Sequence, residues 1–352
     1  MIEGRRFRRI LLIRRKALGD ALVTMPAVLK VASAWPTAAI DLVVDRPFAS
    51  LLAGLAPGIR ILTWPGPSAW SWIRDLRSRR YDLVIDWLGN PRTAMWTALT
   101  GASVRVGYDL PRRSWAYNIK VPRNRLAERP LRGFAGEAFL DPLRLLGLDP
   151  EPWGDGFASG SVREPATAGL GQTYRRWLPQ WTAASGRRVV VMLSATWPAK
   201  AWPDHHGADL LLRLRERGLN PLLVTGPGDE DLETALRRRL PGDAFAPPTN
   251  LLELADLLRE ADLFVGTDCG ARHLAASLGV PTVTLFGPTD PQGWNPASPR
   301  HVAVRTGVAC SPCDLTECPV DGHPCLDELT PGMVLAAIEK MLGRMSDRKV
   351  IS

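Results

Sequence analysis

The segment from Leu263 to Pro291 constrains the fold more than any other part of the chain. It contains an apolar run, a turn with Asp268 and Gly270, a short helical stretch, a second apolar run and a Gly-Pro-Thr loop. Short apolar runs on either side of a helix predict a strand–helix–strand unit of a parallel sheet. In such sheets, ligands bind at the loops that leave the carboxyl ends of the strands. The segment therefore predicts two ligand-binding loops in tandem.

The polar residues of this segment allow two interpretations. In the first, the N–H groups at the start of the helix bind a phosphate. His273 lies one turn after Cys269 and faces the same ligand. In the second, Asp268 caps the helix and His273 is a surface residue whose hydrogen bonds are satisfied. The segment alone favours neither.

The alternation of strands and helices extends over most of the chain. Strands are expected at Arg9–Arg14, Ile40–Asp45, Ile59–Trp64, Tyr81–Trp87, Val104–Tyr108, Val189–Leu193, Pro221–Thr225, Leu263–Gly266, Thr282–Phe286 and His301–Arg305. The predicted fold class is α/β, with two doubly wound domains facing a central cleft. We expect an N-terminal domain over residues 1–150, a linker over 151–186, a second domain over 187–330, and a C-terminal helix and tail over 331–352.

Hydrophobic patterning places the protein in the cytoplasm. No apolar run approaches the roughly 20 residues that span a bilayer. The N-terminal run Ile10–Ile13 is interrupted by Arg14, Arg15 and Lys16, so it is too short for the apolar core of a signal peptide.

Positive charge is concentrated at the start of the chain. Residues 1–16 hold seven basic side chains and one acidic one, which accounts for +6 of the net charge of +8. Such a cluster suits an anionic lipid surface or a phosphorylated acceptor, although a solvated flank is the simpler alternative. A nucleic-acid partner is disfavoured, because no basic helix and no interleaving of basic and aromatic residues follows.

The loop after the first predicted strand contains Gly19 and Asp20. Gly19 permits a tight turn, and Asp20 stands at the start of a helix. An aspartate there is a favoured cap that also complements the helix dipole. The alternative is a carboxylate that acts as a general base.

A second loop combines hydroxyl groups with a lysine. It runs from Ser194 through Thr196 and Lys200 to Pro203, directly after a predicted strand. Hydroxyls and a lysine on a strand-to-helix loop suit phosphate binding. The glycine spacing of a Walker loop is missing.

Together, four motifs resemble glycosyltransferase family 9, the ADP-heptose:lipopolysaccharide heptosyltransferases. They are Arg14 with Gly19-Asp20 and Pro26, Lys200-x-Trp202-Pro203, Asp268-x-Gly270-x-x-His273, and Gly287-Pro288-Thr289-Asp290-Pro291. The resemblance covers nearly the whole chain. It implies a GT-B fold of two Rossmann-like domains, with an N-terminal acceptor-binding domain and a C-terminal domain that binds the nucleotide sugar.

The resemblance implies an inverting glycosyltransferase. It would move a heptose or related sugar from an ADP-sugar to a lipopolysaccharide inner-core or similar anionic lipid-linked acceptor at the cytoplasmic face of the inner membrane. Asp20 is implied as the general base and Lys200 as the partner of the diphosphate. The implied donor-binding residues are Ser194, Thr196, Lys200, Asp268, Gly270, His273, Gly287 and Thr289, and those on the acceptor side are Arg14 and Gly19. No catalytic cofactor is implied, since a lysine and a helix N-terminus can stabilise a diphosphate without a metal.

Two departures from the family pattern and two rival functions stay open. Cys269 stands where the family usually has a hydroxyl residue, and Arg15 and Lys16 stand where the heptosyltransferase I type has small hydroxyl residues. The rivals are a non-catalytic bilobal sugar-nucleotide-binding protein and a sugar-nucleotide epimerase of similar two-domain shape.

Four of the five cysteines form a cluster with the spacing C-x2-C-x4-C-x6-C. They are Cys310, Cys313, Cys318 and Cys325. In a cytosolic chain such clustering favours metal over disulfides, and tetrahedral structural zinc is the natural candidate. Reduced thiols and disulfides are the alternatives. A similar Cys-rich segment occurs in some members of family 9.

Overall fold

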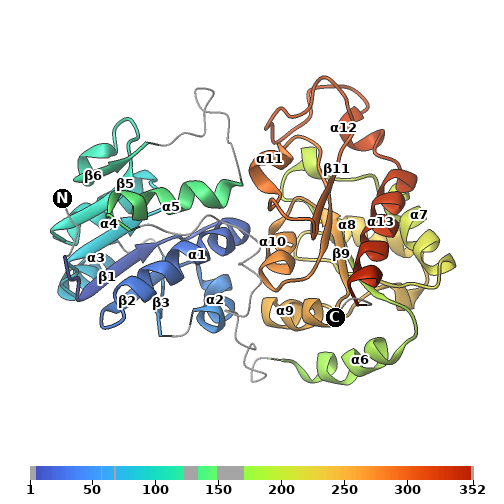
Figure 1. Ribbon diagram of the computed structural model, residues 1–352, viewed down its shortest axis with the longest axis horizontal. Coiled ribbons are helices and arrows are strands. Elements are labelled where there is room, and N and C mark those ends of the chain that lie inside the picture. The colour runs from blue at the N-terminus through green and yellow to red at the C-terminus, as the bar shows by residue number, and fades with distance from the viewer. Residues whose placement is uncertain (1–4, 57, 67–68, 123–133, 149–169, 350–352) are drawn as a thin grey trace. The chain divides into compact units, whose positions relative to one another are not determined.

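The chain folds into two compact units, each with its own parallel sheet. The computed structural model describes residues 5–56, 58–66, 69–122, 134–148 and 170–349 (Figure 1). The described residues up to 148 form the N-terminal unit, and those from 170 on form the C-terminal unit.

The sheet of the N-terminal unit has the strand order β3-β2-β1-β4-β5-β6, with every strand parallel to its neighbours. The strands are β1 (Arg9–Ile13), β2 (Ala39–Val44), β3 (Arg60–Thr63), β4 (Leu83–Asp86), β5 (Val104–Tyr108) and β6 (Ile119–Val121). The helices are α1 (Leu18–Ala34), α2 (Ala49–Leu55), α3 (Ala69–Ser78), α4 (Pro91–Leu99) and α5 (Ala135–Leu145). The order reverses between β1 and β4. Doubly wound sheets bind ligands at this switch point, so the loops after β1 and β4 are in the expected place.

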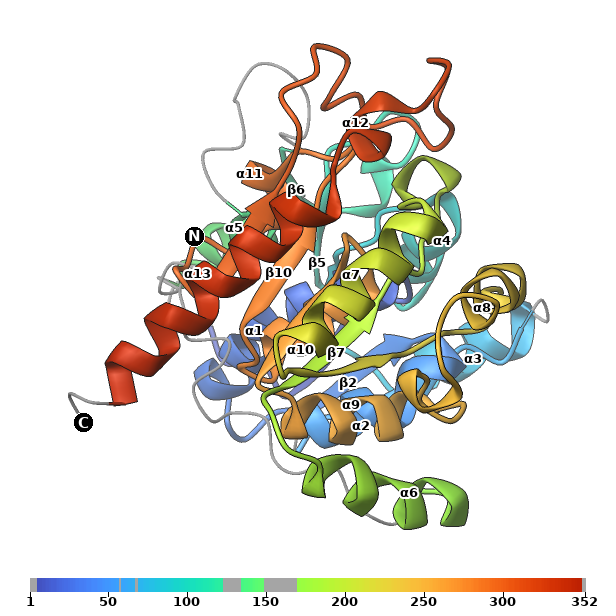
Figure 2. The same cartoon turned by 90° about the vertical axis from the view of Figure 1, so that its right-hand side faces the viewer.

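The sheet of the C-terminal unit has the order β11-β10-β9-β7-β8 and is also parallel. Its strands are β7 (Arg188–Met192), β8 (Asn220–Leu223), β9 (Leu263–Thr267), β10 (Thr282–Leu285) and β11 (His301–Val304). The helices are α6 (Gln172–Ala183), α7 (Asp204–Glu216), α8 (Glu230–Arg237), α9 (Leu251–Glu260), α10 (Gly270–Ser277), α11 (Pro291–Trp294), α12 (Pro324–Asp327) and α13 (Pro331–Lys349). α7 and α13 pack together and share a core with the central strands (Figure 2). The switch point lies between β7 and β9.

Local sequence signals explain several element boundaries. α9 begins after Asn250, whose side chain accepts hydrogen bonds from the N–H groups of Leu252 and Glu253. The Glu253 carboxylate accepts in return from the Asn250 N–H, which completes a capping box. The same carboxylate accepts from the N–H of Gly171 at 2.7 Å and so ties the chain before α6 to α9.

The structure confirms the predicted α/β class with two parallel sheets and adds elements that the sequence did not reveal. β6, α11 and α12 are three or four residues long, too short for a periodic signal. α13 runs from Pro331 to Lys349 and so takes up nearly all of the segment expected as a C-terminal helix and tail. Residues 151–169 of the predicted linker lie outside the described residues. Within the described part of the chain, no helix is both long and apolar enough to cross a bilayer.

Candidate active site

The switch point of the N-terminal unit holds an ion pair between Arg14 and Asp20. Arg14 follows β1 directly and is 5% exposed, and its Nη2 lies 2.7 Å from Oδ2 of Asp20. Arg14 also donates from Nη1 to the carbonyl of Trp87, in the loop after β4, at 2.8 Å. Its guanidinium lies 4.9 Å from the ring centroid of Phe139. The sequence-predicted residues Arg14, Gly19 and Asp20 therefore come together where β1 and β4 end.

The interpretation of Asp20 as a helix cap is wrong. α1 begins at Leu18 with Ala17 as its N-cap residue, and no side chain caps it. Asp20 lies in the first turn, where its charge complements the helix dipole. Its side chain stays 26% exposed and is oriented by Arg14.

Arg15 is the second arginine of the predicted basic cluster that lies inside the unit. It is 6% exposed, and its Nε donates to Oδ1 of Asp45 at 2.8 Å. Its guanidinium stacks on Trp64 with 4.0 Å to the ring centroid, and Arg92 approaches the same ring at 4.6 Å. Arg14 and Arg15 are thus buried structural cations. The exposed members of the cluster are Arg5, Arg6, Arg8, Arg9 and Lys16.

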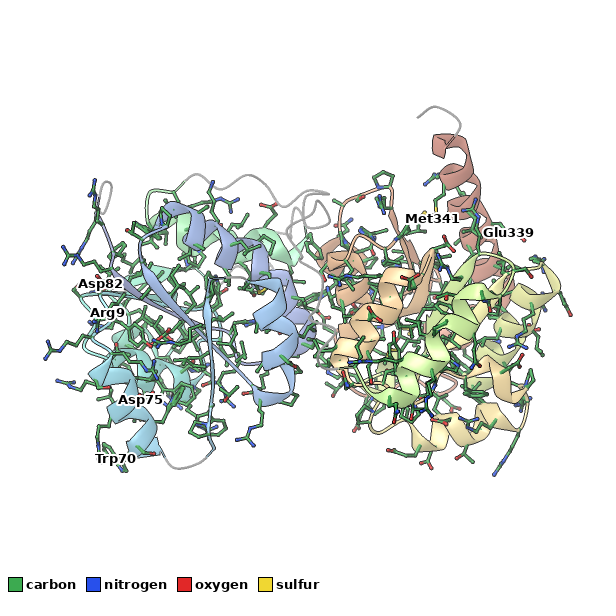
Figure 3. The ribbon with its side chains drawn as sticks, turned by 90° about the horizontal axis from the view of Figure 1, so that it is seen from below. Arg9, Trp70, Asp75, Asp82, Glu339 and Met341 are labelled. Carbon is green, nitrogen blue, oxygen red and sulfur yellow. The ribbon has the colours of Figure 1, made fainter. Side chains whose placement is uncertain are left out.

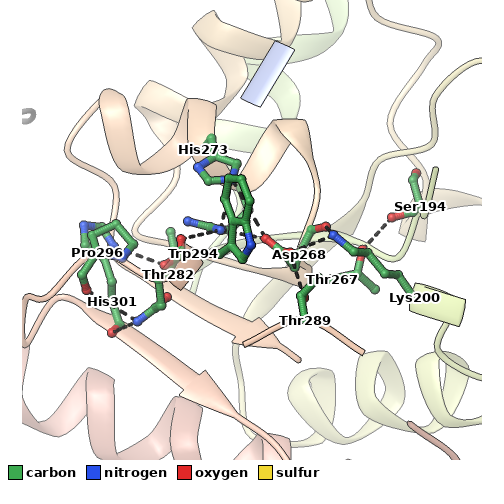
Figure 4. Close-up of polar contacts among 12 residues, drawn as sticks. Ser194, Lys200, Thr267, Asp268, His273, Thr282, Thr289, Trp294, Pro296 and His301 are labelled. Carbon is green, nitrogen blue, oxygen red and sulfur yellow. Dashed lines mark hydrogen bonds and ion pairs between the residues drawn. The ribbon is translucent and has the colours of Figure 1, made fainter. Parts of the chain in front are cut away.

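The C-terminal unit gathers three of its loops on Asp268, which follows β9 (Figure 4). Lys200, from the loop after β7, donates from Nζ to Oδ2 of Asp268 at 2.8 Å. Thr289, from the loop after β10, donates from Oγ1 to the same oxygen at 2.9 Å. Arg272 of α10 donates from Nη2 to Oδ1 at 2.7 Å. The interpretation of Asp268 as a helix cap is also wrong, because the N-cap of α10 is Cys269 and no side-chain cap bond is present there.

Electrostatics keep this network charged and the neighbouring histidine neutral. Burial alone would raise the pKa of Asp268, but Arg272, Lys200 and His273 lower it below its usual value. Burial lowers the pKa of His273 well below 6.5, and Arg272 adds to that effect. The imidazole lies 3.1 Å from Nη2 of Arg272 and edge-on to the Trp294 ring. His273 is buried, so its interpretation as a surface residue is wrong.

The other predicted donor residues differ in how they contact the residues around Asp268. The Ser194 hydroxyl donates to the Asp229 carboxylate. The backbone carbonyl of Ser194 accepts from Thr267 Oγ1 at 2.5 Å. Gly270 opens α10, whereas Thr196 is exposed and lies outside the network. Gly287 is small for a packing reason: a Cβ there would approach Leu326 to 2.7 Å.

Comparison with known proteins identifies the chain. A model of glycosyltransferase family 9 (heptosyltransferase) matches residues 69–323. The chain belongs to this family. Among its relatives, lipopolysaccharide heptosyltransferase 1 of Pseudomonas aeruginosa is 30% identical over 87% of this chain and 86% of that protein. Lipopolysaccharide heptosyltransferase 3 of Escherichia coli is 26% identical over 92% of this chain and 96% of that protein.

Solved structures of family 9 enzymes share the fold. ADP-heptose lipopolysaccharide heptosyltransferase II of E. coli superposes with a TM-score of 0.72 at 19% identity, covering 96% of this chain and 99% of that one. The E. coli heptosyltransferase WaaC with ADP gives a TM-score of 0.68 at 23% identity, covering 95% and 99%. The predicted GT-B fold and the predicted glycosyltransferase class are confirmed.

Two residues that hold the predicted donor residues in place were missed in the sequence. Arg272 is fully buried, bridging Asp268 and the Trp294 carbonyl, which accepts from its Nη2 at 2.8 Å. An arginine inside the apolar stretch Ala271–Ala276 was the available signal. Asp229 holds Ser194 and accepts from the N–H of Gly226 at 2.6 Å. No local pattern pointed to it.

The four clustered cysteines of this family 9 chain are free thiols. Cys310 and Cys313 are exposed, Cys318 is half-buried and Cys325 is buried. Burial and the three neighbouring cysteines raise the pKa of Cys325 to about 11. Across the described residues, no three His, Cys, Asp or Glu side chains form a group that could hold a metal ion. The thiols are neighbours without a preformed coordination shell.

Proposed function

We propose that the protein transfers a heptose, or a closely related sugar, with inversion from an ADP-sugar to a lipopolysaccharide inner-core or similar lipid-linked acceptor. The observation that carries this proposal is the convergence of Lys200, Arg272 and Thr289 on Asp268 at the switch point of the C-terminal sheet. The two relatives named above are lipopolysaccharide heptosyltransferases, and WaaC was solved with ADP. We assign the donor to the C-terminal unit and the acceptor to the N-terminal unit, with the domain limits given above.

The donor network suits a diphosphate leaving group. Two cations and one carboxylate leave it with net positive charge, because the imidazole of His273 is neutral. The Lys200 side chain is 14% exposed, so its ammonium can reach a bound phosphate. Thr289 and the first N–H groups of α10 add donors beside it. Together these groups would stabilise the charge that develops on ADP as it leaves.

Asp268 serves the donor in two ways in this proposal. Three of the roughly four lone-pair positions of a carboxylate are occupied by Lys200, Thr289 and Arg272. Asp268 therefore orients Lys200 and keeps room for one sugar hydroxyl. This adds a positioning role to the donor-binding role that the family resemblance implies for Asp268.

Asp20 is the proposed general base on the acceptor side. Its carboxylate takes the proton of the acceptor hydroxyl while that oxygen attacks C1 of the heptose. The bond from C1 to the ADP oxygen breaks as the new bond forms, and ADP leaves with the electron pair. Attack from the face opposite ADP inverts the configuration at C1. Arg14 holds the Asp20 carboxylate in place through the 2.7 Å ion pair.

We propose that the exposed arginines near the start of the chain bind an anionic membrane surface on its cytoplasmic side. Arg5, Arg6, Arg8 and Arg9 are exposed at the amino end of β1, where the N–H of Arg9 binds Asp82 (Figure 3). Each basic residue near an anionic surface contributes about 1 kcal/mol. Sedimentation with anionic liposomes should show binding that high salt abolishes. Binding that salt leaves unchanged, or no binding, would contradict the tether.

For the four cysteines we propose structural zinc, bound once the exposed thiols close around the metal. Four thiolates are a suitable donor set for zinc. The buried Cys325, with the other three as neighbours, gives such a site an anchor. The proposal predicts about one zinc per chain in purified protein by elemental analysis. Metal-free protein with four titratable thiols would leave the cluster as reduced cysteines.

The test of the proposed reaction is calorimetric. ADP-heptose, ADP-glucose, UDP-glucose and ADP are titrated separately into the full-length protein. We expect ADP-heptose to bind most tightly and ADP to be released only when an inner-core acceptor is added. ADP binding without a gain from heptose would overturn the choice of sugar. Turnover without acceptor would overturn transfer and favour an epimerase or a hydrolase.

A further inference from the structure

The Cys-rich segment is hydrogen-bonded to both loops that reach Asp268. We call residues 306–330, which contain Cys310, Cys313, Cys318 and Cys325, the clip. On the Lys200 loop, the N–H of Ala199 donates to the carbonyl of Thr316 at 3.1 Å. Nε2 of His323 lies 2.9 Å from the Ala199 carbonyl, and it must be the donor because a carbonyl only accepts. The clip thus holds both backbone groups of the residue next to Lys200.

The clip also holds the loop that carries Thr289. The Ser311 hydroxyl donates to the carbonyl of Gly287 at 2.6 Å. The N–H groups of Cys313 and Asp314 both donate to the carbonyl of Pro288 at 2.9 Å. The two residues before Thr289 are therefore fixed by one short stretch of the clip.

The clip is itself anchored to the core of the C-terminal unit. Leu326 is fully buried against Gly287, where there is no space for a Cβ. The indole of Trp202 donates to the carbonyl of Leu329 at 2.8 Å. Within the clip, the Thr306 hydroxyl donates to the carbonyl of Cys325 at 3.2 Å. The hydrogen bonds to the two loops therefore start from a fixed base.

We propose that the clip sets the spacing of the Lys200 and Thr289 loops, and that His323 and Ser311 are positioning residues for donor binding. Lys200 and Thr289 meet at one oxygen of Asp268, at 2.8 and 2.9 Å, so a small shift of either loop breaks that junction. The inference rests on the proposed donor role of Lys200. It gives the Cys-rich segment a function whether or not its thiols hold a metal.

The test is a double-mutant cycle on ADP affinity. His323→Ala and Ser311→Ala should each weaken ADP binding about 3- to 10-fold in calorimetry, the effect of one lost hydrogen bond. Because His323 acts through Lys200, His323→Ala should cause no further loss in a Lys200→Ala background. His323→Gln keeps an N–H donor toward Ala199 and should restore most of the affinity.

Two control variants separate positioning from general stability. His205→Ala removes an exposed histidine of α7, and Ser33→Ala removes a hydroxyl-to-carbonyl bond in the N-terminal unit. Both should leave ADP affinity unchanged, and melting temperatures are measured for every variant. ADP affinity equal to wild type in His323→Ala and Ser311→Ala, or a loss in His323→Ala that is fully additive with that of Lys200→Ala, would overturn the inference alone. Failure of the unaltered protein to bind ADP would overturn the proposed function and the inference with it.

Discussion

Asp20 and Asp268 both lie near the carboxyl end of a central strand of their own unit, yet their surroundings differ sharply. Each follows a central strand, beside the switch point of its sheet. The Asp20 side chain is 26% exposed and paired with Arg14. The Asp268 side chain is 5% exposed and bound by Lys200, Arg272 and Thr289. The fold places both carboxylates near strand ends, and the side chains around each carboxylate determine whether it can accept a proton.

In the proposed reaction, the difference in exposure and in partners makes Asp20 a proton acceptor and Asp268 a fixed negative charge. A solvent-accessible carboxylate held by one arginine can approach a substrate hydroxyl and take its proton. A buried carboxylate with its pKa lowered by two cations stays ionised and organises its neighbours. Asp20 should therefore control the rate of reaction, whereas Asp268 should control stability and donor affinity.

Replacement of the base should have the largest effect. Asp20→Asn keeps the size of the side chain but removes proton acceptance, so kcat should fall about 10²- to 10⁴-fold. ADP affinity should stay close to wild type. The melting temperature should fall less than in Asp268→Asn, because Asp20 is partly exposed and Arg14 keeps its hydrogen bond to the Trp87 carbonyl. Rates are measured as acceptor-dependent ADP release.

An Asp20→Glu variant, which restores a carboxylate, serves as the matched control and should recover part of the rate. Full turnover in Asp20→Asn would remove Asp20 as the base and would erase the functional contrast with Asp268.

Replacement of Asp268 should act mainly on folding. Asp268→Asn leaves Arg272 buried without its counter-charge, and the loss of one partner of a buried ion pair costs about 3–5 kcal/mol. The free energy of unfolding is measured by urea titration. Adding Arg272→Met, which removes the stranded charge, should recover part of the loss. If the Asp268→Asn variant is as stable as wild type, the ion pair between Asp268 and Arg272 does not contribute to the stability of the fold.

Removal of the lysine tests the donor side of the comparison. Lys200→Ala should weaken ADP binding about 10- to 100-fold, since hydrogen bonds to charged groups contribute about 1.5–3 kcal/mol. Calorimetry measures the change, with Lys30→Ala, on α1 in the other unit, as the control. Lys200→Arg should restore only part of the affinity, because guanidinium and ammonium differ in shape. Unchanged affinity in Lys200→Ala would place the diphosphate elsewhere.

The smallest effect concerns pH. The pKa of His273 is lowered in the folded protein, so below pH 6.5 the unfolded chain binds a proton that the folded chain does not. The free energy of unfolding should therefore decrease as the pH falls from about 6.5 toward 5, by up to about 1.4 kcal/mol per pH unit from this group. In urea titrations, His273→Gln should flatten this slope, whereas the exposed His205→Gln should not. An equal slope in His273→Gln and wild type would contradict the neutral buried imidazole.

The sequence predicted the fold well, because central parallel strands carry strong local signals. β1, β7, β9 and β10 are short segments rich in apolar residues between helical stretches, and their boundaries agree with prediction within one or two residues. The sequence also predicts Asp20, Lys200, Asp268 and Thr289 as site residues, because they lie in the connections that follow strands of the two sheets. Short elements such as α12 carry little local signal, because their boundaries depend on tertiary contacts.

The arginines show what sequence alone does not reveal. Arg14 and Arg15 were assigned to one exposed cluster, but their partners Trp87 and Trp64 are distant in the chain. Only the assembled sheet brings these groups together and makes burial of two guanidinium groups favourable. For the same reason, neither the contact of Arg272 with the Trp294 carbonyl nor the link between Ala199 and His323 could be read from local patterns.

The position of the clip in the sequence also determines when, during synthesis, the Lys200 and Thr289 loops can reach their final conformation. Ribosomes add about 5–20 residues per second, and domains fold as units during synthesis, beginning at the N-terminus. The strands of the N-terminal unit all precede residue 149, so that sheet can close early. The loops of Lys200 and Thr289 must wait until residues 311–323 have left the ribosome tunnel. Nascent chains should therefore form the sheet of the N-terminal unit first and become able to bind a nucleotide only after residues 311–323 have emerged.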